Sequence, residues 1–126
     1  MNENRKGNAL IIDDDPMNNK LLRTVLESKG NYIVHDTVDA VEGFKKAYDC
    51  RPDVILMETQ MPGMDGLSMI WIIKSESSLK DIPIVAVSGN AMDGDREKAL
   101  AAGCDGYISK PIDVKNFVDT LEQYIQ

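Results

Sequence analysis

The chain has 126 residues, of which 43% are hydrophobic and 28% are charged, and this composition suits one globular domain spanning residues 1–126. Its formal net charge of −7 would repel a phosphate backbone and no lysine or arginine stripe interrupts the acidity, which argues against nucleic-acid binding and favours a protein partner. Cys50 and Cys104 lack the spacing of a disulfide framework or zinc site, and no apolar run approaches the length of a membrane span.

Apolar runs alternate with amphipathic runs along the chain, which is typical of a doubly wound parallel sheet with helices on both faces. We expect about residues 1–7 to form a flexible tail, too short for a signal peptide, on a cytoplasmic protein. Five strand–helix units follow, with strands predicted at about residues 8–13, 32–35, 53–57, 82–87 and 106–109.

Helix boundaries are signalled by capping residues. Asp15 with Pro16 predicts the start of the first helix, Asp39 with Glu42 resembles a capping box, and Gly103 is expected to end the fourth helix. Two apolar faces are predicted to point inward: Val41, Phe44, Ala47 and Tyr48 in the second helix, and Val114, Phe117, Val118, Leu121 and Ile125 in the last.

Polar side chains collect just past the predicted strands, where doubly wound sheets bind ligands. The residues concerned are Asp13, Asp14, Glu58, Ser88 and Lys110. Acids at strand ends also cap helices, as expected for Asp15, but that role does not account for residues at four strand ends. Carboxylates gathered this closely would repel one another without a cation, and oxygen ligands of this kind suit Mg²⁺, so the sequence predicts a magnesium site with a neighbouring lysine.

Five motifs in order resemble the response-regulator receiver domain over essentially the whole chain. They are Leu-Ile-Ile-Asp-Asp-Asp-Pro at 10–16, Pro-Asp-Val-Ile-Leu-Met at 52–57, Gln-Met-Pro-Gly-Met-Asp-Gly at 60–66, Val-Ser at 87–88 and Tyr-Ile-Ser-Lys-Pro at 107–111. The resemblance implies a flavodoxin-like five-stranded fold. It also implies a two-component phosphorelay, in which a histidine kinase or phosphotransfer protein phosphorylates an aspartate after the third strand.

The resemblance also assigns roles to individual residues. Asp13 and Asp14 are similar to the acidic pair that holds Mg²⁺, and the backbone carbonyl of Gln60 would be a further ligand. Ser88 is similar to the hydroxyl that binds the phosphoryl group. Lys110 is similar to the lysine that pairs with this group, and its bond to Pro111 is expected to be cis. Tyr107 is similar to the aromatic switch that turns inward when Ser88 moves.

The sequence departs from the family at the phosphoacceptor, where Glu58 stands in place of aspartate. The added methylene moves the carboxylate by about 1.5 Å, and misplacing a reacting group by about 1 Å can cost on the order of 100-fold in rate. We therefore expect phosphorylation to be impaired, and Mg²⁺ binding to be weakened or altered. The longer side chain also places a negative charge where a phosphoryl group would lie, which would mimic the active state partly or not at all.

A second departure lies in the third helix, predicted over about residues 67–75. At 100° per residue, Trp71 falls nearly opposite the cluster of Met69, Ile70 and Ile73, and Ile72 lies on its flank. We hypothesise that Trp71 and Ile72 form an exposed apolar interaction patch. The alternative is that Trp71 folds back over the edge of the core.

Three classes of function fit parts of this pattern. The leading hypothesis is a stand-alone receiver without independent enzyme activity, which switches a downstream protein through the face formed by the fourth helix, fifth strand and fifth helix. Charged residues of that face are Asp93, Asp95, Arg96, Glu97 and Lys98. The alternative is a metal-dependent phosphohydrolase, although the chain has no room for the cap such enzymes carry. Nucleotide or flavin binding lacks the glycines that let a backbone approach phosphate.

Overall fold

The computed structural model describes residues 7–63, 65–89 and 94–125. Five parallel strands form one sheet in the order β2-β1-β3-β4-β5. The strands are β1 (Gly7–Ile12), β2 (Tyr32–Thr37), β3 (Val54–Met57), β4 (Ile84–Ser88) and β5 (Gly106–Ser109). The helices are α1 (Pro16–Ser28), α2 (Ala40–Cys50), α3 (Gly66–Ser75), α4 (Asp95–Ala102) and α5 (Phe117–Glu122). The predicted doubly wound fold is confirmed.

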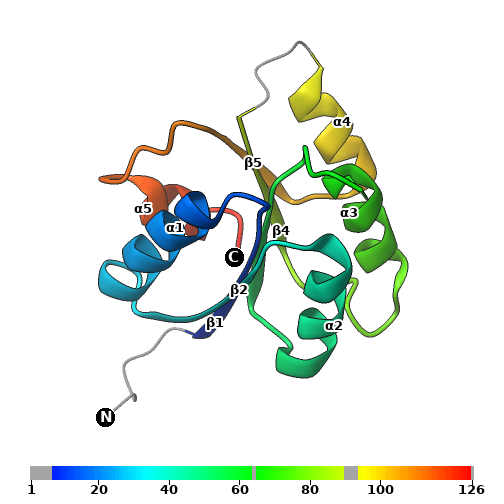
Figure 1. Ribbon diagram of the computed structural model, residues 1–126, viewed down its shortest axis with the longest axis horizontal. Coiled ribbons are helices and arrows are strands. Elements are labelled where there is room, and N and C mark those ends of the chain that lie inside the picture. The colour runs from blue at the N-terminus through cyan, green and yellow to red at the C-terminus, as the bar shows by residue number, and fades with distance from the viewer. Residues whose placement is uncertain (1–6, 64, 90–93, 126) are drawn as a thin grey trace.

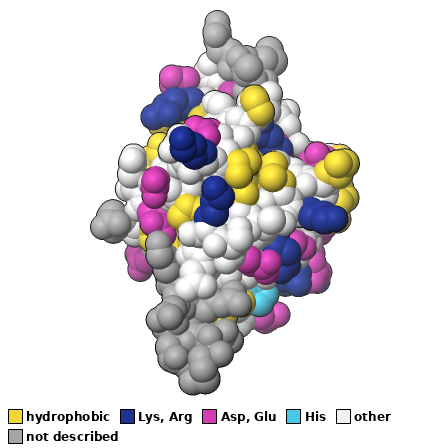
Figure 2. All heavy atoms as spheres, turned by 90° about the vertical axis from the view of Figure 1, so that its left-hand side faces the viewer, with side chains coloured by type: hydrophobic (Ala, Val, Ile, Leu, Met, Phe, Trp, Pro, Cys, Tyr) yellow, Lys and Arg dark blue, Asp and Glu magenta, His cyan; other side chains and the backbone are white. Residues whose placement is uncertain are grey.

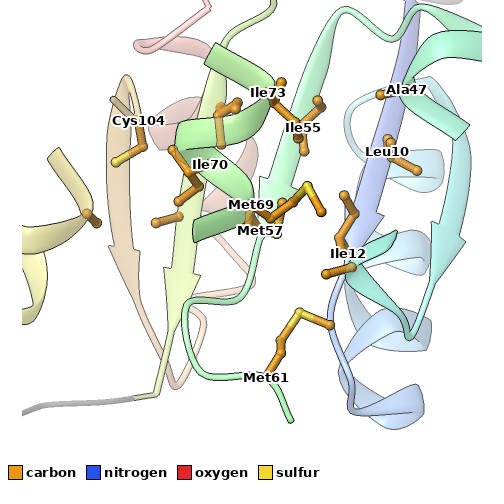
Figure 3. Close-up of a cluster of buried hydrophobic side chains, with 14 of the residues drawn as sticks. Leu10, Ile12, Ala47, Ile55, Met57, Met61, Met69, Ile70, Ile73 and Cys104 are labelled. Carbon is orange, nitrogen blue, oxygen red and sulfur yellow. The ribbon is translucent and has the colours of Figure 1, made fainter. Parts of the chain in front are cut away.

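Helices cover both faces of the sheet, with α1 and α5 on one side and α2, α3 and α4 on the other (Figure 1). Because successive strand residues point to opposite faces, each strand feeds two cores. Leu10 and Ile12 pack with α2 and α3 in one cluster, which Figure 3 shows in close-up, whereas Ala9 and Ile11 pack with α1 and α5 in the other. This double burial explains why the strands read as continuous apolar runs rather than alternating ones.

The predicted helix caps form, but the capping box at Asp39 is only half made, because the Asp39 N–H donates to Thr37 Oγ1 instead of the Glu42 side chain. The side chain of Asp15 accepts a hydrogen bond from the Met17 N–H, and Pro16 is the first residue of α1. The Asp39 side chain accepts from the Glu42 N–H at 2.8 Å, and α4 stops at Gly103, whose φ of 116° is left-handed. Local signals therefore set where these helices begin and end.

The inward face predicted for α2 is wrong at two positions, because Val41 and Tyr48 are exposed. The residues that α2 buries are small: Ala40, Gly43 and Ala47. A Cβ atom added at Gly43 would meet the Ile12 side chain, so the helix lies too close to β1 for a larger residue there. Close approach, rather than the size of the apolar side chains, selects this face.

The chain ends need two further corrections. Val114 is exposed and precedes α5, whose buried residues are Phe117, Val118 and Leu121. Most of the predicted N-terminal tail lies outside the described residues, but Gly7 already pairs with Tyr32 in the sheet. Within the ranges given above, no helix has the length and apolar character needed to cross a membrane.

The outer face formed by α1 and α5 is polar in character. Charged side chains of both signs are distributed over it, with hydrophobic side chains between them (Figure 2). Met17 and Leu21, one turn apart on α1, are both exposed.

Candidate functional site

Strand register brings the predicted site residues to one edge of the sheet. Ile12 pairs with Met57, so Asp13 and Glu58 leave adjacent strands side by side, and the Glu58 N–H donates to the Ile12 carbonyl at 2.9 Å. On the other side of β4, Ser88 pairs with Ser109, and the Lys110 N–H donates to the Ser88 carbonyl at 2.8 Å. The carboxyl ends of four parallel strands thus gather acids, a hydroxyl and a lysine, as expected for this topology.

Lys110 joins the two buried acids of this edge. Its Nζ lies 2.9 Å from Asp13 Oδ2 and 2.6 Å from Glu58 Oε1. Asp13 is only 2% exposed and Glu58 6%, so both charges depend on partners within the protein. Burial by itself lowers the pKa of Lys110, but the hydrogen bonds and charges of Glu58 and Asp13 outweigh it and raise the pKa above its usual value. We call Asp13, Glu58 and Lys110 the acid pocket.

Other donors hold the remaining oxygens of the acid pocket. Asp13 Oδ1 accepts from the Asp15 N–H at 2.9 Å, and Asp13 Oδ2 accepts from Asn18 Nδ2 at 2.6 Å. Glu58 Oε2 accepts from the Gln60 N–H at 3.0 Å. Sequence reasoning missed Asn18, although its position in the first turn of a helix that starts beside the pocket was a usable signal. Each carboxylate is therefore fixed from more than one side.

Of the residues predicted to bind Mg²⁺, Asp13 and Glu58 are both paired with Lys110. Their oxygens have the chemistry that Mg²⁺ prefers. However, the positive charge between Asp13 and Glu58 is that of Lys110, and Asp14 is exposed. Among residues 7–63, 65–89 and 94–125, no three Asp, Glu, His or Cys side chains come together as metal ligands. Gln60 contributes its N–H to Glu58.

A layer of hydroxyl groups lies behind the acid pocket. Thr59 is fully buried, and its Oγ1 lies 3.4 Å from Glu58 Oε2 and 2.8 Å from Ser88 Oγ. Ser88 is 1% exposed. Thr59 therefore stands between two predicted site residues, a role that sequence reasoning missed because a lone threonine after a strand carries no distinctive signal.

Tyr107 points inward, and its hydroxyl donates to Asp95 Oδ2. The pKa of Tyr107 is raised to about 12, mainly by burial and next by the hydrogen bond to Asp95. The prediction that Asp95 belongs to a charged surface is wrong, because Asp95 is only 5% exposed. Arg96, Glu97 and Lys98 are exposed as predicted, and Asp93 lies outside the described residues. The first residue of α4 turns inward because Tyr107 and Thr59 offer it hydroxyl donors.

The apolar patch predicted on α3 is only half present. Trp71 is 63% exposed, so it does not fold back over the core. Ile72 is partly buried and packs against the core cluster on the α3 side, which corrects its assignment to an exposed patch. Its position on the flank of the buried stripe of Met69, Ile70 and Ile73 explains the contact.

The Lys110–Pro111 peptide bond is cis, as predicted.

Comparison with known proteins is consistent with this geometry. A family profile described as "Response regulator receiver domain" matches residues 9–122. The chain is 38% identical over 117 residues to the polar-differentiation response regulator DivK of Brucella anthropi, covering 93% of this chain and 94% of DivK. The Brucella ovis DivK shows the same identity and coverage.

Solved structures are also similar. The receiver domain of a sensor histidine kinase from Pseudomonas aeruginosa, crystallised with magnesium coordinated in its active-site cleft, is 32% identical with a TM-score of 0.85, over 94% of this chain and 97% of that one. The chemotaxis protein CheY4 of Vibrio cholerae is 25% identical with a TM-score of 0.85, over 93% of this chain and 97% of that one. These similarities span nearly the full length of both compared chains.

Proposed function

The chain belongs to the response-regulator receiver domain family. From this premise we propose that, in the signalling state of this protein, Lys110 is paired with the carboxylate of Glu58 rather than with a phosphoryl group. The observation that carries this proposal is the contact of 2.6 Å between Glu58 Oε1 and Lys110 Nζ. In the family the lysine pairs with the phosphoryl group, whereas here a resident carboxylate already occupies it. Tyr107, at the position of the aromatic switch, points inward at the same time.

Glu58 is expected to be a poor phosphoacceptor for two physical reasons. Its carboxylate extends one methylene beyond that of aspartate, and phosphoryl transfer depends almost wholly on in-line positioning. Both of its oxygens are also engaged, Oε1 by Lys110 and Oε2 by the Gln60 N–H. An attacking oxygen would have to leave these donors and expose a buried charge, which raises the barrier.

Mg²⁺ binding is proposed to be weakened for the same reason. Lys110 offsets one of the two negative charges that would otherwise attract the ion. Magnesium in the cleft of the similar Pseudomonas aeruginosa receiver supports the view that this edge of the fold is where the ion would bind. The residues available to hold it are Asp13 and Asp14 together with Glu58 and the carbonyl of Gln60, once Lys110 has moved aside.

Two kinds of protein partner are proposed. A histidine kinase or phosphotransfer protein would approach the carboxyl edge of the sheet, where the acid pocket lies. A downstream target would bind the face of α4, β5 and α5, where Arg96, Glu97 and Lys98 are exposed charges suited to selective docking. Receiver domains work through such partners, and the acidic net charge of −7 is compatible with protein rather than nucleic-acid contacts.

The test is the intact mass of the protein after incubation with Mg²⁺ and a small phosphodonor such as acetyl phosphate. The parent protein is expected to keep its mass, because Glu58 does not accept the group. The matched control is Glu58→Asp, which restores the shorter acceptor and is expected to gain one phosphoryl group. A stable phosphoryl adduct mapped to Glu58 in the parent would refute the proposal.

A further inference from the structure

Asp95 is a buried carboxylate outside the acid pocket, at the first position of α4. The residue before it, Gly94, makes no side-chain capping bond, so the start of this helix depends on other contacts. Asp95 is only 5% exposed, and a buried charge is costly unless hydrogen bonds satisfy it. Its oxygens accept from the Tyr107 hydroxyl on β5 and lie 3.5 Å from Thr59 Oγ1 after β3. One side chain thus ties α4 to two strands.

Thr59 connects this carboxylate to the acid pocket. Its single hydroxyl proton has three acceptors within reach, at 2.8 Å on Ser88 Oγ, 3.4 Å on Glu58 Oε2 and 3.5 Å on Asp95 Oδ1. The proton can serve only one of them fully. A change in the charge or position of Glu58 therefore alters which acceptor Thr59 serves, and with it the hydrogen bonding of Asp95.

We propose that Asp95 is a positioning residue that couples the acid pocket to α4, by holding both Tyr107 and the first turn of the helix. This inference rests on the proposed function and adds its internal route: Glu58, Thr59, Asp95 and then Tyr107. A discrete hydrogen-bond rearrangement at Thr59 supplies the two arrangements that such coupling requires. The burial of Asp95 strengthens the coupling, because hydrogen bonds to a charged group are strong in a water-excluded site.

The competing explanation is that Asp95 only stabilises the helix start electrostatically, as an acid in the first turn does. Two variants separate these roles. Asp95→Glu keeps the charge at the helix start but displaces the carboxylate from Tyr107, whereas Asp95→Asn keeps the shape and removes the charge. Coupling predicts that both variants disturb Tyr107 and α4. A purely electrostatic role predicts that only Asp95→Asn disturbs α4.

The experiment measures amide hydrogen exchange of residues 98–102 with Glu58 intact and in Glu58→Gln, each in two backgrounds, the parent chain and the Asp95→Asn variant. With Asp95 present, Glu58→Gln is expected to speed exchange in this segment about tenfold, the size of one charged hydrogen bond. In the Asp95→Asn background the same change is expected to have less than about a twofold effect. Residues 40–50 of α2 serve as the internal control and should not respond.

Thr59→Val provides an independent arm, because it removes the connecting hydroxyl while leaving Asp95 and Tyr107 in place. It is expected to abolish the response of residues 98–102 to Glu58→Gln, even if an Asp95 variant folds poorly. An equal response of α4 in all backgrounds would overturn the inference. The result is separable from the proposed function, because the phosphodonor measurement on Glu58 does not involve Asp95 or Thr59.

Discussion

The two edges of the sheet use charged residues in different ways. At the amino edge, acids and a lysine bind the backbone: Asp53 Oδ2 accepts from the Asn8 N–H at 2.7 Å, Asp105 Oδ2 accepts from the Ile84 N–H at 2.9 Å, and Lys74 Nζ donates to the Ile82 carbonyl at 2.8 Å. At the carboxyl edge the charged side chains of Asp13, Glu58 and Lys110 bind one another.

Burial separates the edges further. The Lys74–Asp105 ion pair at 2.8 Å includes a carboxylate that is 41% exposed, whereas the acids that Lys110 joins are 2% and 7% exposed in their side chains. The carboxylates at the amino edge complete backbone hydrogen bonds and remain accessible to water, whereas the two lysines are similarly buried, with side chains 17% and 20% exposed. The two carboxylates at the carboxyl edge are buried and depend on Lys110, which is the arrangement that makes a site sensitive to one added or removed charge.

The largest contrast is expected between the two lysines. Lys110→Met keeps the aliphatic stem but leaves two buried carboxylates without their cation, so we expect a loss of about 3 kcal/mol in the free energy of unfolding. Lys74→Met leaves an acid that water can reach, and we expect a loss of about 1 kcal/mol. Urea unfolding of both variants measures the difference. Equal losses would mean that the two edges do not differ energetically.

The next effect concerns the backbone that shapes the carboxyl edge. A Cβ atom added at Gly66 would collide with the backbone carbonyl of Glu58, since α3 starts directly against the end of β3. Gly66→Ala is expected to cost about 2 kcal/mol because backbone must shift to make room. Gly89→Ala is the control, as its Cβ atom would lie 3.6 Å from Lys110 Cδ in ordinary contact. A neutral Gly66→Ala variant in the same urea assay would contradict this close approach.

The carboxyl edge should also make the stability of the fold sensitive to high pH. Tyr107 has its pKa raised from 10.0 to about 12, so the folded state holds this proton more tightly than the unfolded state. That contribution is complete below the ordinary tyrosine pKa and is lost as pH rises toward about 12. The raised pKa of Lys110 acts in the same direction.

Tyr107→Phe removes the tyrosine contribution. Between about pH 8 and pH 11, the parent is expected to lose about 1 kcal/mol more stability than Tyr107→Phe, which thermal unfolding across pH can measure. Tyr32, whose pKa is also raised by burial and by its bond to Glu122, is present in both proteins and so cancels. Identical pH profiles would show that Tyr107 does not hold its proton through Asp95 and burial.

The smallest effect is expected away from both edges. Trp71 is 63% exposed on α3, so Trp71→Gln should change the free energy of unfolding by no more than about 0.5 kcal/mol. Ile73→Val, at a fully buried position of the same helix, should cost about 1 kcal/mol. If Trp71→Gln proved the more damaging of the two, the indole would have to contribute packing that its exposure does not suggest.

Local patterns were enough to predict the architecture. The apolar runs predicted the strands because the sheet is covered on both faces, and Asp15, Asp39 and Gly103 marked helix ends through interactions with their own neighbours in sequence. The meeting of Asp13, Glu58 and Lys110 followed from the same patterns, because the carboxyl ends of parallel strands lie at one edge.

What each side chain touches at that edge was decided by the tertiary structure. Lys110 lies between the two acids, Asp95 is buried where a surface charge was expected, and Thr59 connects the two regions without any signal in the sequence. Likewise, Gly43 rather than the larger Val41 faces the sheet in α2. Periodicity and capping depend on residues a few positions apart, whereas these contacts join elements that are distant in the sequence and depend on how closely those elements approach.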